Sequence, residues 1–286
     1  MNQILKYRTG TKVPVSRMSG GVRYLTFPLL EKTGLVKHGI STREGGVSQG
    51  IYATMNLSFT SGDSPDCVRE NYNRIGAALG IPVERMVCTQ QTHTVNVRKV
   101  TEEDCGKGVV KERDYTGVDG LVTNIPGICL VTFYADCVPI LFVDPVHRAI
   151  GACHSGWRGT VRKMGEVTLK KMSEYYGTRP EDVVAAIGPS ICQDCYEVSQ
   201  DVAEEFARAF PAHSGEETLM YRKPDGKYQL NLWRANELVL LEAGVRPEHL
   251  EITDLCTCCN PELLFSHRAS AGKRGNLGAF LALKEA

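Results

Sequence analysis

Apolar residues along this chain fall into short runs whose spacing predicts a mixture of strands and helices. Near-continuous apolar runs are typical of strands buried on both faces, and they cover 128–134, 138–143 and 149–153. Shorter strand-like runs lie at 35–40, 86–89, 94–97, 121–123 and 183–187, and a last strand opens at Ile252. The run 24–30 contains Pro28, which favours a position at the edge of a sheet.

Helical spacing of apolar residues predicts amphipathic helices over 66–80, 160–176, 199–210 and 231–243. The first of these ends at Gly80, just before Pro82, as helices commonly do. Strands and helices mix without strict alternation, which favours a layered α/β (α+β) fold. We expect one catalytic domain over 1–286, in which 1–34 is a peripheral N-terminal segment.

Charge and cysteine content narrow the class of protein. Lys plus Arg and Asp plus Glu each number 33, so the chain lacks the basic surplus typical of proteins that bind nucleic acid or anionic membranes. No stretch approaches the roughly 20 apolar residues of a membrane helix, and the start lacks the apolar core of a signal peptide. We therefore expect a cytoplasmic protein. In that compartment the eleven cysteines favour metal binding, catalysis or packing over disulfides.

Reactive side chains concentrate near the predicted strand ends, in the segments 90–93, 134–137, 153–159, 254–259 and 265–268. From the first three segments, His93, Cys137 and His154 would form a compact zinc set with a fourth position open, as in catalytic zinc sites. A lone buried cysteine commonly serves as a small hydrophobe, and a lone histidine as a hydrogen-bonding group. The spacing between the three residues leaves both interpretations open.

Several strings resemble the signature of one family. They are Gln91-Thr92-His93, Ala135 to Ile140 and His154-Ser155-Gly156-Trp157-Arg158-Gly159, and they look like the YfiH/YlmD family, also labelled "multicopper polyphenol oxidase" or "laccase domain". Further family-like segments follow in the right order, at 41–48, 56–58, 119–120, 187–191, 195–198 and 265–268. The resemblance covers about residues 35–280, which makes it specific.

This resemblance implies a layered α-β-β-α sandwich of the kind found in bacterial toxin deamidase domains. It implies zinc held by His93, Cys137 and His154. The implied activity is phosphorolysis of purine nucleosides (adenosine, inosine and methylthioadenosine), with adenosine deaminase as a side activity. Purine nucleosides and phosphate would then be the partners of the chain.

Further residues have expected roles at such a site. Asp136 is a candidate to orient a metal-bound histidine, and Arg158, near a predicted helix start, is a candidate to meet an anion. Arg43 lies with Ser41 in a glycine-rich loop that suits phosphate. Gln91, two residues from His93, is a candidate to bind the substrate. Glu197 and His267 are weaker candidates.

The sequence also bears on three other functions. Multicopper catalysis needs many His-x-His pairs, whereas the chain has seven histidines and no such pair, although copper could occupy the His/Cys/His site. Cys137 could instead be the nucleophile of a hydrolase or deamidase, with a histidine as its base. Finally, Cys192, Cys195, Cys256, Cys258 and Cys259 could hold a structural zinc in a protein without catalytic activity.

Overall fold

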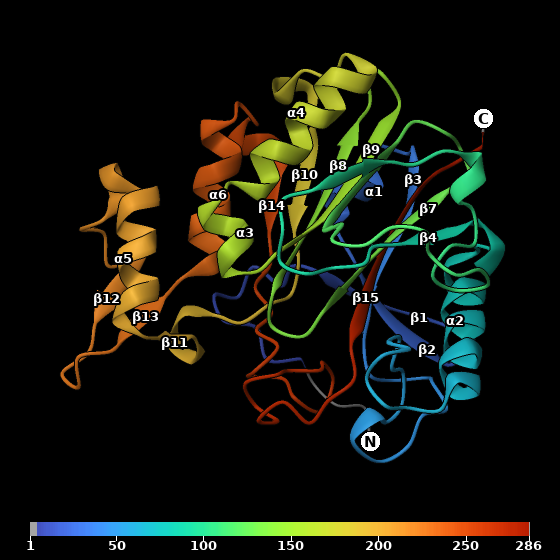
Figure 1. Cartoon of the computed structure of the whole chain (residues 1–286), viewed down its shortest axis with the longest axis horizontal. Coiled ribbons are helices and arrows are strands. Elements are labelled where there is room, and N and C mark those ends of the chain that lie inside the picture. Colours follow the sequence, from blue (N-terminus) through green and yellow to red (C-terminus); the bar gives the residue numbers. More distant parts are fainter. Residues whose placement is uncertain (1–4, 286) are drawn as a thin grey trace.

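Two six-stranded β-sheets lie face to face in this computed structural model, which describes residues 5–285 (Figure 1). The first sheet has the order β1 (Val15–Ser19), β2 (Val22–Thr26), β3 (Val36–Ser41), β15 (Leu277–Leu283), β7 (Cys129–Tyr134) and β4 (Met86–Cys88). The second has the order β14 (Leu250–Ile252), β10 (Val184–Ile187), β8 (Val138–Asp144), β9 (Ala149–Ser155), β6 (Gly120–Thr123) and β5 (Val97–Lys99).

The central core lies between these sheets. Leu130 and Leu281 of the first sheet belong to one buried cluster with Leu141 and Ile150 of the second. The runs predicted to be buried on both faces are β7, β8 and β9, and every residue of β8 and β9 is buried. Burial on both faces explains why these strands carry continuous apolar sequence instead of an alternating pattern.

Helices cover the two outer faces. Helix α2 (Pro65–Leu79) packs Val68, Tyr72 and Ile75 against the first sheet, and these residues share a cluster with Phe280. Helices α4 (Met164–Tyr176) and α6 (Leu232–Glu242) cover the second sheet, where Leu169 joins the outer cluster. The layers therefore run helix, sheet, sheet, helix, and the predicted mixed α/β class is confirmed.

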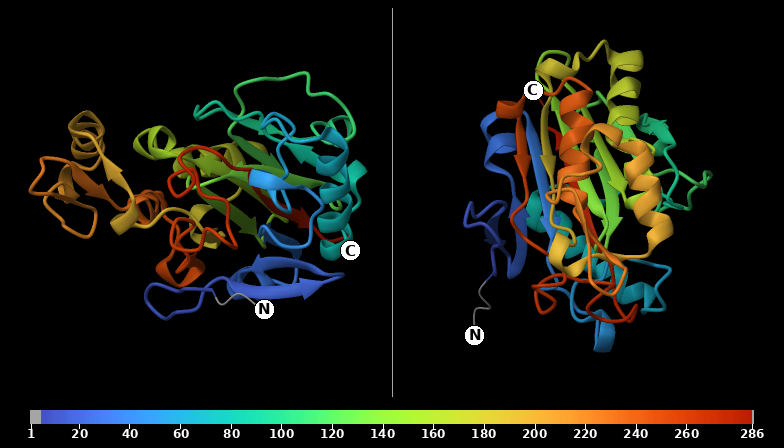
Figure 2. Two further views of the ribbon diagram at one scale, coloured as in Figure 1. Left: turned by 90° about the horizontal axis from the view of Figure 1, so that it is seen from below. Right: turned by 90° about the vertical axis from the view of Figure 1, so that its left-hand side faces the viewer.

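A smaller unit projects from one side of the sheets (Figure 2). It consists of α5 (Gln200–Ala209) and a three-stranded sheet in the order β11 (Glu197–Val198), β13 (Tyr228–Leu230), β12 (Met220–Arg222). Phe206 and Leu230 of this unit share the apolar cluster of α4 and α6. The projection is therefore packed onto the body through a common core.

Four local predictions differ from the structure. The last strand is predicted to open at Ile252, whereas β14 ends at that residue and the last strand is β15. The helix predicted over 160–176 is interrupted at Lys163, whose φ of 58° separates α3 (Trp157–Val161) from α4. Pro28 begins a short helix, α1 (Pro28–Lys32), instead of lying in an edge strand, because proline suits the first helical turn. Strand β5 begins only at Val97, three residues after the predicted start.

The N-terminal segment contributes to the first sheet. Within 1–34, described from residue 5, β1 forms the sheet edge and β2 lies inside it. Leu25 and Phe27 are fully buried there. No helix among residues 5–285 is long and apolar enough to cross a bilayer.

Short 3₁₀ helices complete the connections. They are η1 (Gly50–Tyr52), η2 (Val83–Arg85), η3 (Glu102–Asp104), η4 (Pro180–Asp182), η5 (Gln193–Cys195), η6 (Pro211–His213) and η7 (Pro247–His249).

Candidate metal centre and pocket

The structure brings His93, Cys137 and His154 together at one end of the stacked sheets. His93 lies in the loop between β4 and β5, Cys137 in the turn that crosses from β7 to β8, and His154 near the end of β9. Their ligand atoms all lie within 4.8 Å of one another. The two imidazole rings meet edge to face, with centroids 5.0 Å apart. The three residues predicted to bind zinc therefore form one cluster.

Asp119, directly before β6, organises this cluster. His154 Nδ1 bonds Asp119 Oδ1 at 2.8 Å, so the hydrogen bond assigns the ring proton to Nδ1 and leaves Nε2 as the ligand atom. The same carboxylate accepts backbone N–H groups from Thr92, His93 and Thr94, at 3.1, 3.1 and 2.9 Å. One buried side chain thus fixes both the ring of His154 and the loop that presents His93.

The backbone around the cluster has special geometry. His93 and Asp136 have φ angles of 61° and 88°, in the left-handed region that most residues avoid. Gly156 packs against the cluster, because an added Cβ would lie 3.0 Å from Cys137 Sγ and 3.1 Å from His93 Cδ2. This close approach gives a physical reason for glycine in the His-Ser-Gly-Trp-Arg-Gly string.

The electrostatics of the cluster favour a thiolate. Burial by itself raises the pKa of Cys137, but the two neighbouring histidines outweigh it and lower that pKa to about 6. Burial lowers the pKa of His154, but the Cys137 thiolate and Asp119 raise it to about 9. The pKa of Asp119, raised by burial, is brought to about 2 by its hydrogen bonds from His154 and the backbone. The residues are therefore poised as a thiolate beside a cationic imidazole.

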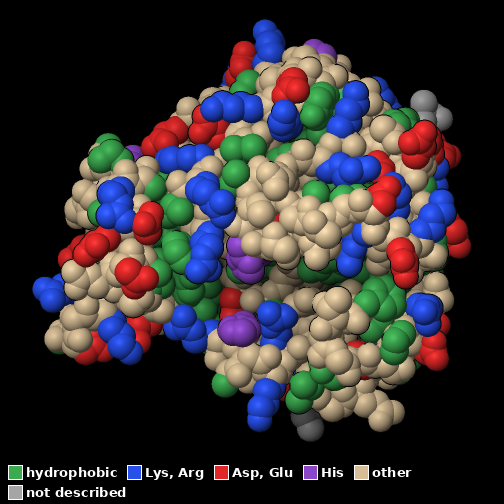
Figure 3. Space-filling model, viewed as in Figure 1, with side chains coloured by type: hydrophobic (Ala, Val, Ile, Leu, Met, Phe, Trp, Pro, Cys, Tyr) green, Lys and Arg blue, Asp and Glu red, His purple; other side chains and the backbone are tan. Residues whose placement is uncertain are grey.

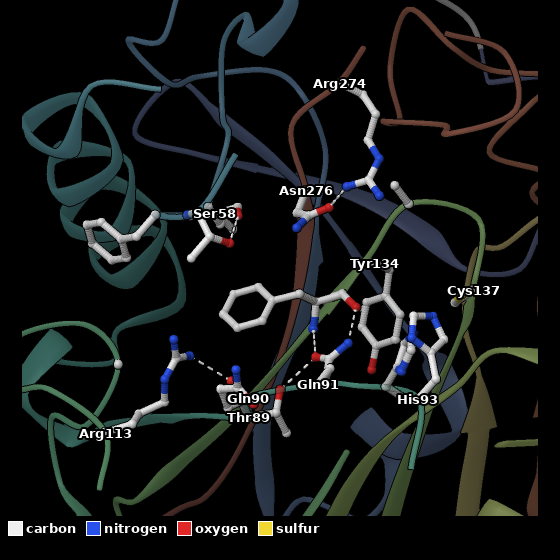
Figure 4. A pocket seen from close by; sticks show the side chains of 17 residues that line it. Ser58, Thr89, Gln90, Gln91, His93, Arg113, Tyr134, Cys137, Arg274 and Asn276 are labelled. Carbon is white, nitrogen blue, oxygen red and sulfur yellow. Dashed lines mark hydrogen bonds between the residues drawn. The ribbon is translucent and has the colours of Figure 1, made fainter. Parts of the chain in front are cut away.

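A cavity of about 240 Å³ opens beside this cluster (Figure 4). The three candidate ligands lie at one end of it, and Phe59 and Phe133 add apolar rings to its wall. In the space-filling view, a hollow near the middle of this face is bordered by histidine and by Lys or Arg side chains (Figure 3).

Two arginines line the cavity. Arg274, in the segment before β15, has a buried Nε without a hydrogen-bond partner among the described residues. Burial lowers the pKa of Arg274, although Asp136 and Cys137 partly oppose this. Arg113 approaches from another side and donates to the Thr89 carbonyl at 2.8 Å (Figure 4). These guanidinium groups make the cavity suitable for an anion.

The substrate-binding residues predicted from sequence are largely engaged elsewhere. Gln91 lines the cavity, but its amide donates to Phe133 O at 2.8 Å and accepts from Phe133 N at 2.7 Å. Arg43 donates to the carbonyls of Ala53 and Pro261 at 2.9 and 2.6 Å. These bonds hold two loops together, and Arg43 is not among the residues that line the cavity.

Ser41 is also engaged within the fold. It is fully buried, and its hydroxyl accepts the N–H of Gly278 at 2.9 Å. Of the weaker candidates, Glu197 pairs with Lys223 and Lys227, and His267 is exposed.

Asp136 and Arg158 differ from the expected arrangement. The Asp136 carboxylate accepts from Thr257 Oγ1 and from the backbone N–H of Arg268, each at 2.6 Å, so Asp119 takes the position expected for it beside a histidine. Arg158 is exposed and stacks on the ring of Trp157, 4.4 Å from its centroid. Asp136 therefore holds the turn that carries Cys137, through its contacts with Thr257 and Arg268.

Sequence reasoning missed Asp119, Arg113 and Arg274 as site residues. Asp119 belongs to the family-like segment 119–120 and directly precedes a predicted strand, but no role was predicted for its side chain. Arg113 and Arg274 stand in irregular segments and carry no local signal.

A sequence profile described as "Multi-copper polyphenol oxidoreductase laccase" matches residues 37–284, almost the whole chain. The chain belongs to the YfiH/YlmD family. It is 36% identical to purine nucleoside phosphorylase YlmD of Bacillus subtilis over 252 residues, which cover 87% of this chain and 88% of the relative. It is 38% identical to purine nucleoside phosphorylase YlmD of Geobacillus stearothermophilus, and the match covers 86% of this chain and 90% of that relative.

A solved structure of the family has the same fold. The crystal structure of Bacillus licheniformis YfiH, described as a hypothetical protein, matches with a TM-score of 0.87 at 30% identity and covers 94% of this chain and 99% of its own. The profile carries an oxidase label, whereas the curated relatives are called phosphorylases. The similarity to the family that the motifs indicate therefore extends to the fold of nearly the whole chain.

Proposed function

We propose that this chain is a zinc-dependent purine nucleoside phosphorylase. It would cleave adenosine, inosine and methylthioadenosine with phosphate, and adenosine deamination would be a side activity. The observation that carries the proposal is one cavity lined both by the His93/Cys137/His154 cluster and by Arg274, whose guanidinium has a buried Nε without a hydrogen-bond partner among the described residues. The names of the relatives support the same activity.

The chemistry of the cluster fits zinc. Two imidazoles and one thiolate are a catalytic donor set, and the carboxylate of Asp119 behind His154 is the usual outer partner of a zinc-bound histidine. When bound there, zinc supplies Lewis acidity toward an oxygen in the cavity. The same donors accept copper, which we regard as an alternative metal at this position rather than a sign of laccase chemistry.

Two arginines of the chain would bind the phosphate. In phosphorolysis a phosphate oxygen bonds to ribose C1′, the C1′–N bond breaks, and the base leaves with the electron pair and takes up a proton. Arg274 offers a buried guanidinium whose Nε lacks a partner, and a bound phosphate would satisfy it. Arg113 adds positive charge from the other side of the cavity.

The apolar wall would hold the purine. Phe59 and Phe133 line the cavity together with Leu57, which gives a flat base an apolar surface. Tyr134 lies behind His154, with ring centroids 5.8 Å apart, and its hydroxyl donates to Cys153 O at 3.1 Å. Tyr134 therefore supports the ring of His154 instead of offering its hydroxyl to the substrate.

Chromatography of products tests this function. Inosine and adenosine are incubated with the purified chain, with and without phosphate. We expect hypoxanthine or adenine together with ribose 1-phosphate only when phosphate is present, and a smaller yield of inosine from adenosine. Release of free ribose without phosphate would make the chain a hydrolase, and absence of any base would contradict the proposal.

A second candidate rests on a specific observation. Without metal, Cys137, His154 and Asp119 have the arrangement of a cysteine nucleophile, its base and an orienting carboxylate. A cysteine hydrolase or deamidase would use them in this way, and a resemblance to toxin deamidases would fit it. The two functions respond differently to chelation, which should abolish the phosphorylase and spare the hydrolase. A cytoplasmic location and a single catalytic domain remain predictions under either function.

A further inference from the structure

A second group of thiols lies apart from the cavity, at the base of the projecting unit. Cys192 directly precedes η5 and Cys195 is its last residue, in the connection from β10 to β11, and Cys256 and Cys259 follow β14. The four sulfur atoms lie within 4.8 Å of one another, and Cys195 Sγ is 3.6 Å from Cys259 Sγ. Residues 64 positions apart in sequence therefore meet in one cluster.

We propose that Cys192, Cys195, Cys256 and Cys259 bind a second zinc ion with a structural role. A tetrahedron with Zn–S bonds of about 2.3 Å has edges of about 3.8 Å, which agrees with the compact arrangement of these sulfurs. A four-iron cluster would stand between its cysteines and hold them further apart. The geometry therefore fits one ion with four thiolate ligands and no open position.

The backbone already supports such a site. The Cys-x-x-Cys segment turns through η5, and the N–H of Cys192 donates to Cys256 Sγ at 3.3 Å. The second segment is paired to the first, because the N–H of Thr257 donates to Ser190 O at 3.1 Å. Cys258, between two of the ligands, does not belong to the group. Four of the five cysteines considered from the sequence thus form the cluster.

The ion would fasten the projecting unit to the body. One ligand pair leads directly into β11, and the other belongs to the loop that carries Thr257. Thr257 Oγ1 donates to Asp136 Oδ1 at 2.6 Å, and Asp136 adjoins Cys137. The second ion would therefore also stiffen the turn that presents Cys137. This last consequence rests on the proposed function, whereas binding of the ion does not.

Metal content per chain tests the proposal. We expect two zinc ions in the purified chain by elemental analysis. The double variant Cys195→Ser/Cys259→Ser should retain one, the variant Cys137→Ala should also retain one, and the matched control Cys258→Ser should retain two. One zinc in the unmodified chain, lost in Cys137→Ala and kept in the double variant, would overturn the second site while leaving the proposed function intact.

Two measurements on the unmodified chain keep the test decisive if the double variant does not fold. Cobalt(II) added to the metal-free chain should give the strong thiolate-to-metal absorption of a four-thiolate site, in addition to the weaker one of a His/Cys/His site. Thiol titration of the unfolded, unreduced chain should find all eleven cysteines free. Absence of the four-thiolate absorption, or a disulfide between Cys195 and Cys259, would overturn the proposal.

Discussion

The two metal-ligand clusters of this molecule differ in what surrounds them. The His93/Cys137/His154 cluster mixes nitrogen and sulfur, is tied to the carboxylate of Asp119, and borders a cavity. The cluster of Cys192, Cys195, Cys256 and Cys259 has four thiols, is tied by backbone N–H groups, and does not line that cavity. Three ligands facing a cavity suit chemistry, whereas four ligands without one suit a structural role.

The largest effect is expected on catalytic activity, which should depend on the His93/Cys137/His154 cluster. The substitution Cys137→Ala should reduce phosphorolysis of inosine to background, because it removes the only thiolate of the open site. The matched control Cys67→Ala replaces a half-buried cysteine of α2 and should change neither activity nor metal content. Activity in Cys137→Ala close to that of the unmodified chain would make the open cluster a non-catalytic one.

The pH dependence of thiol reactivity should also distinguish the His93/Cys137/His154 cluster. In the metal-free chain, alkylation of Cys137 by iodoacetamide should have its midpoint near pH 6, because the two histidines lower the pKa of its thiol to about 6. The thiolate is present above that pH, and protonation removes it as the pH falls. Peptide mass spectrometry assigns the label to Cys137, and added zinc should protect it. A midpoint near 9 would contradict the arrangement.

A substitution of Asp119, whose carboxylate bonds His154, should affect zinc at the His93/Cys137/His154 cluster and not at the four-thiolate cluster. The substitution Asp119→Asn should weaken its zinc affinity by about 10–100-fold, since outer partners of metal-bound histidines have effects of that size. Titration of the metal-free variant with zinc in the presence of a competing chelator measures the change. Zinc at the four-thiolate cluster should bind as before, and equal weakening at both clusters would instead indicate general loss of structure.

Smaller effects are expected from substituting Arg274, which lines the cavity, and Arg43, which binds backbone carbonyls. Arg274→Gln should raise the KM for phosphate by about tenfold or more, since a charged hydrogen bond contributes about 1.5–3 kcal/mol. Arg43→Gln should instead lower the free energy of unfolding by about 1–3 kcal/mol, because it leaves two carbonyls without their donor. Arg208→Gln, exposed on α5, is the control for both. A raised phosphate KM in Arg43→Gln alone would reverse the assignment.

The sequence predicted the core better than the site. Continuous apolar runs identified β7, β8 and β9, because burial on both faces leaves its mark in neighbouring residues. The interruption of the predicted helix at Lys163 was not predicted, since the helical pattern of apolar residues continues through it.

The candidate ligands His93, Cys137 and His154 were predicted from family-like strings. Their spacing alone did not distinguish metal binding from a structural role. Asp119 was not predicted because its partner is distant in sequence: Asp119 meets His154 across 35 positions. Arg274 was not predicted because it stands in an irregular segment, where no local pattern marks a residue that lines a cavity. Arg43 misled because a glycine-rich loop with an arginine is typical of anion sites, whereas here the guanidinium binds backbone carbonyls. Such pairings are decided by tertiary packing and not by local pattern.

We propose that phosphorolysis by this chain depends on metal at His93, Cys137 and His154. The most direct test is cleavage of inosine in the presence of phosphate by the metal-free chain, before and after zinc is added back. We predict no hypoxanthine before zinc and full recovery after it, with no recovery in Cys137→Ala. Full activity in the metal-free chain would contradict the claim.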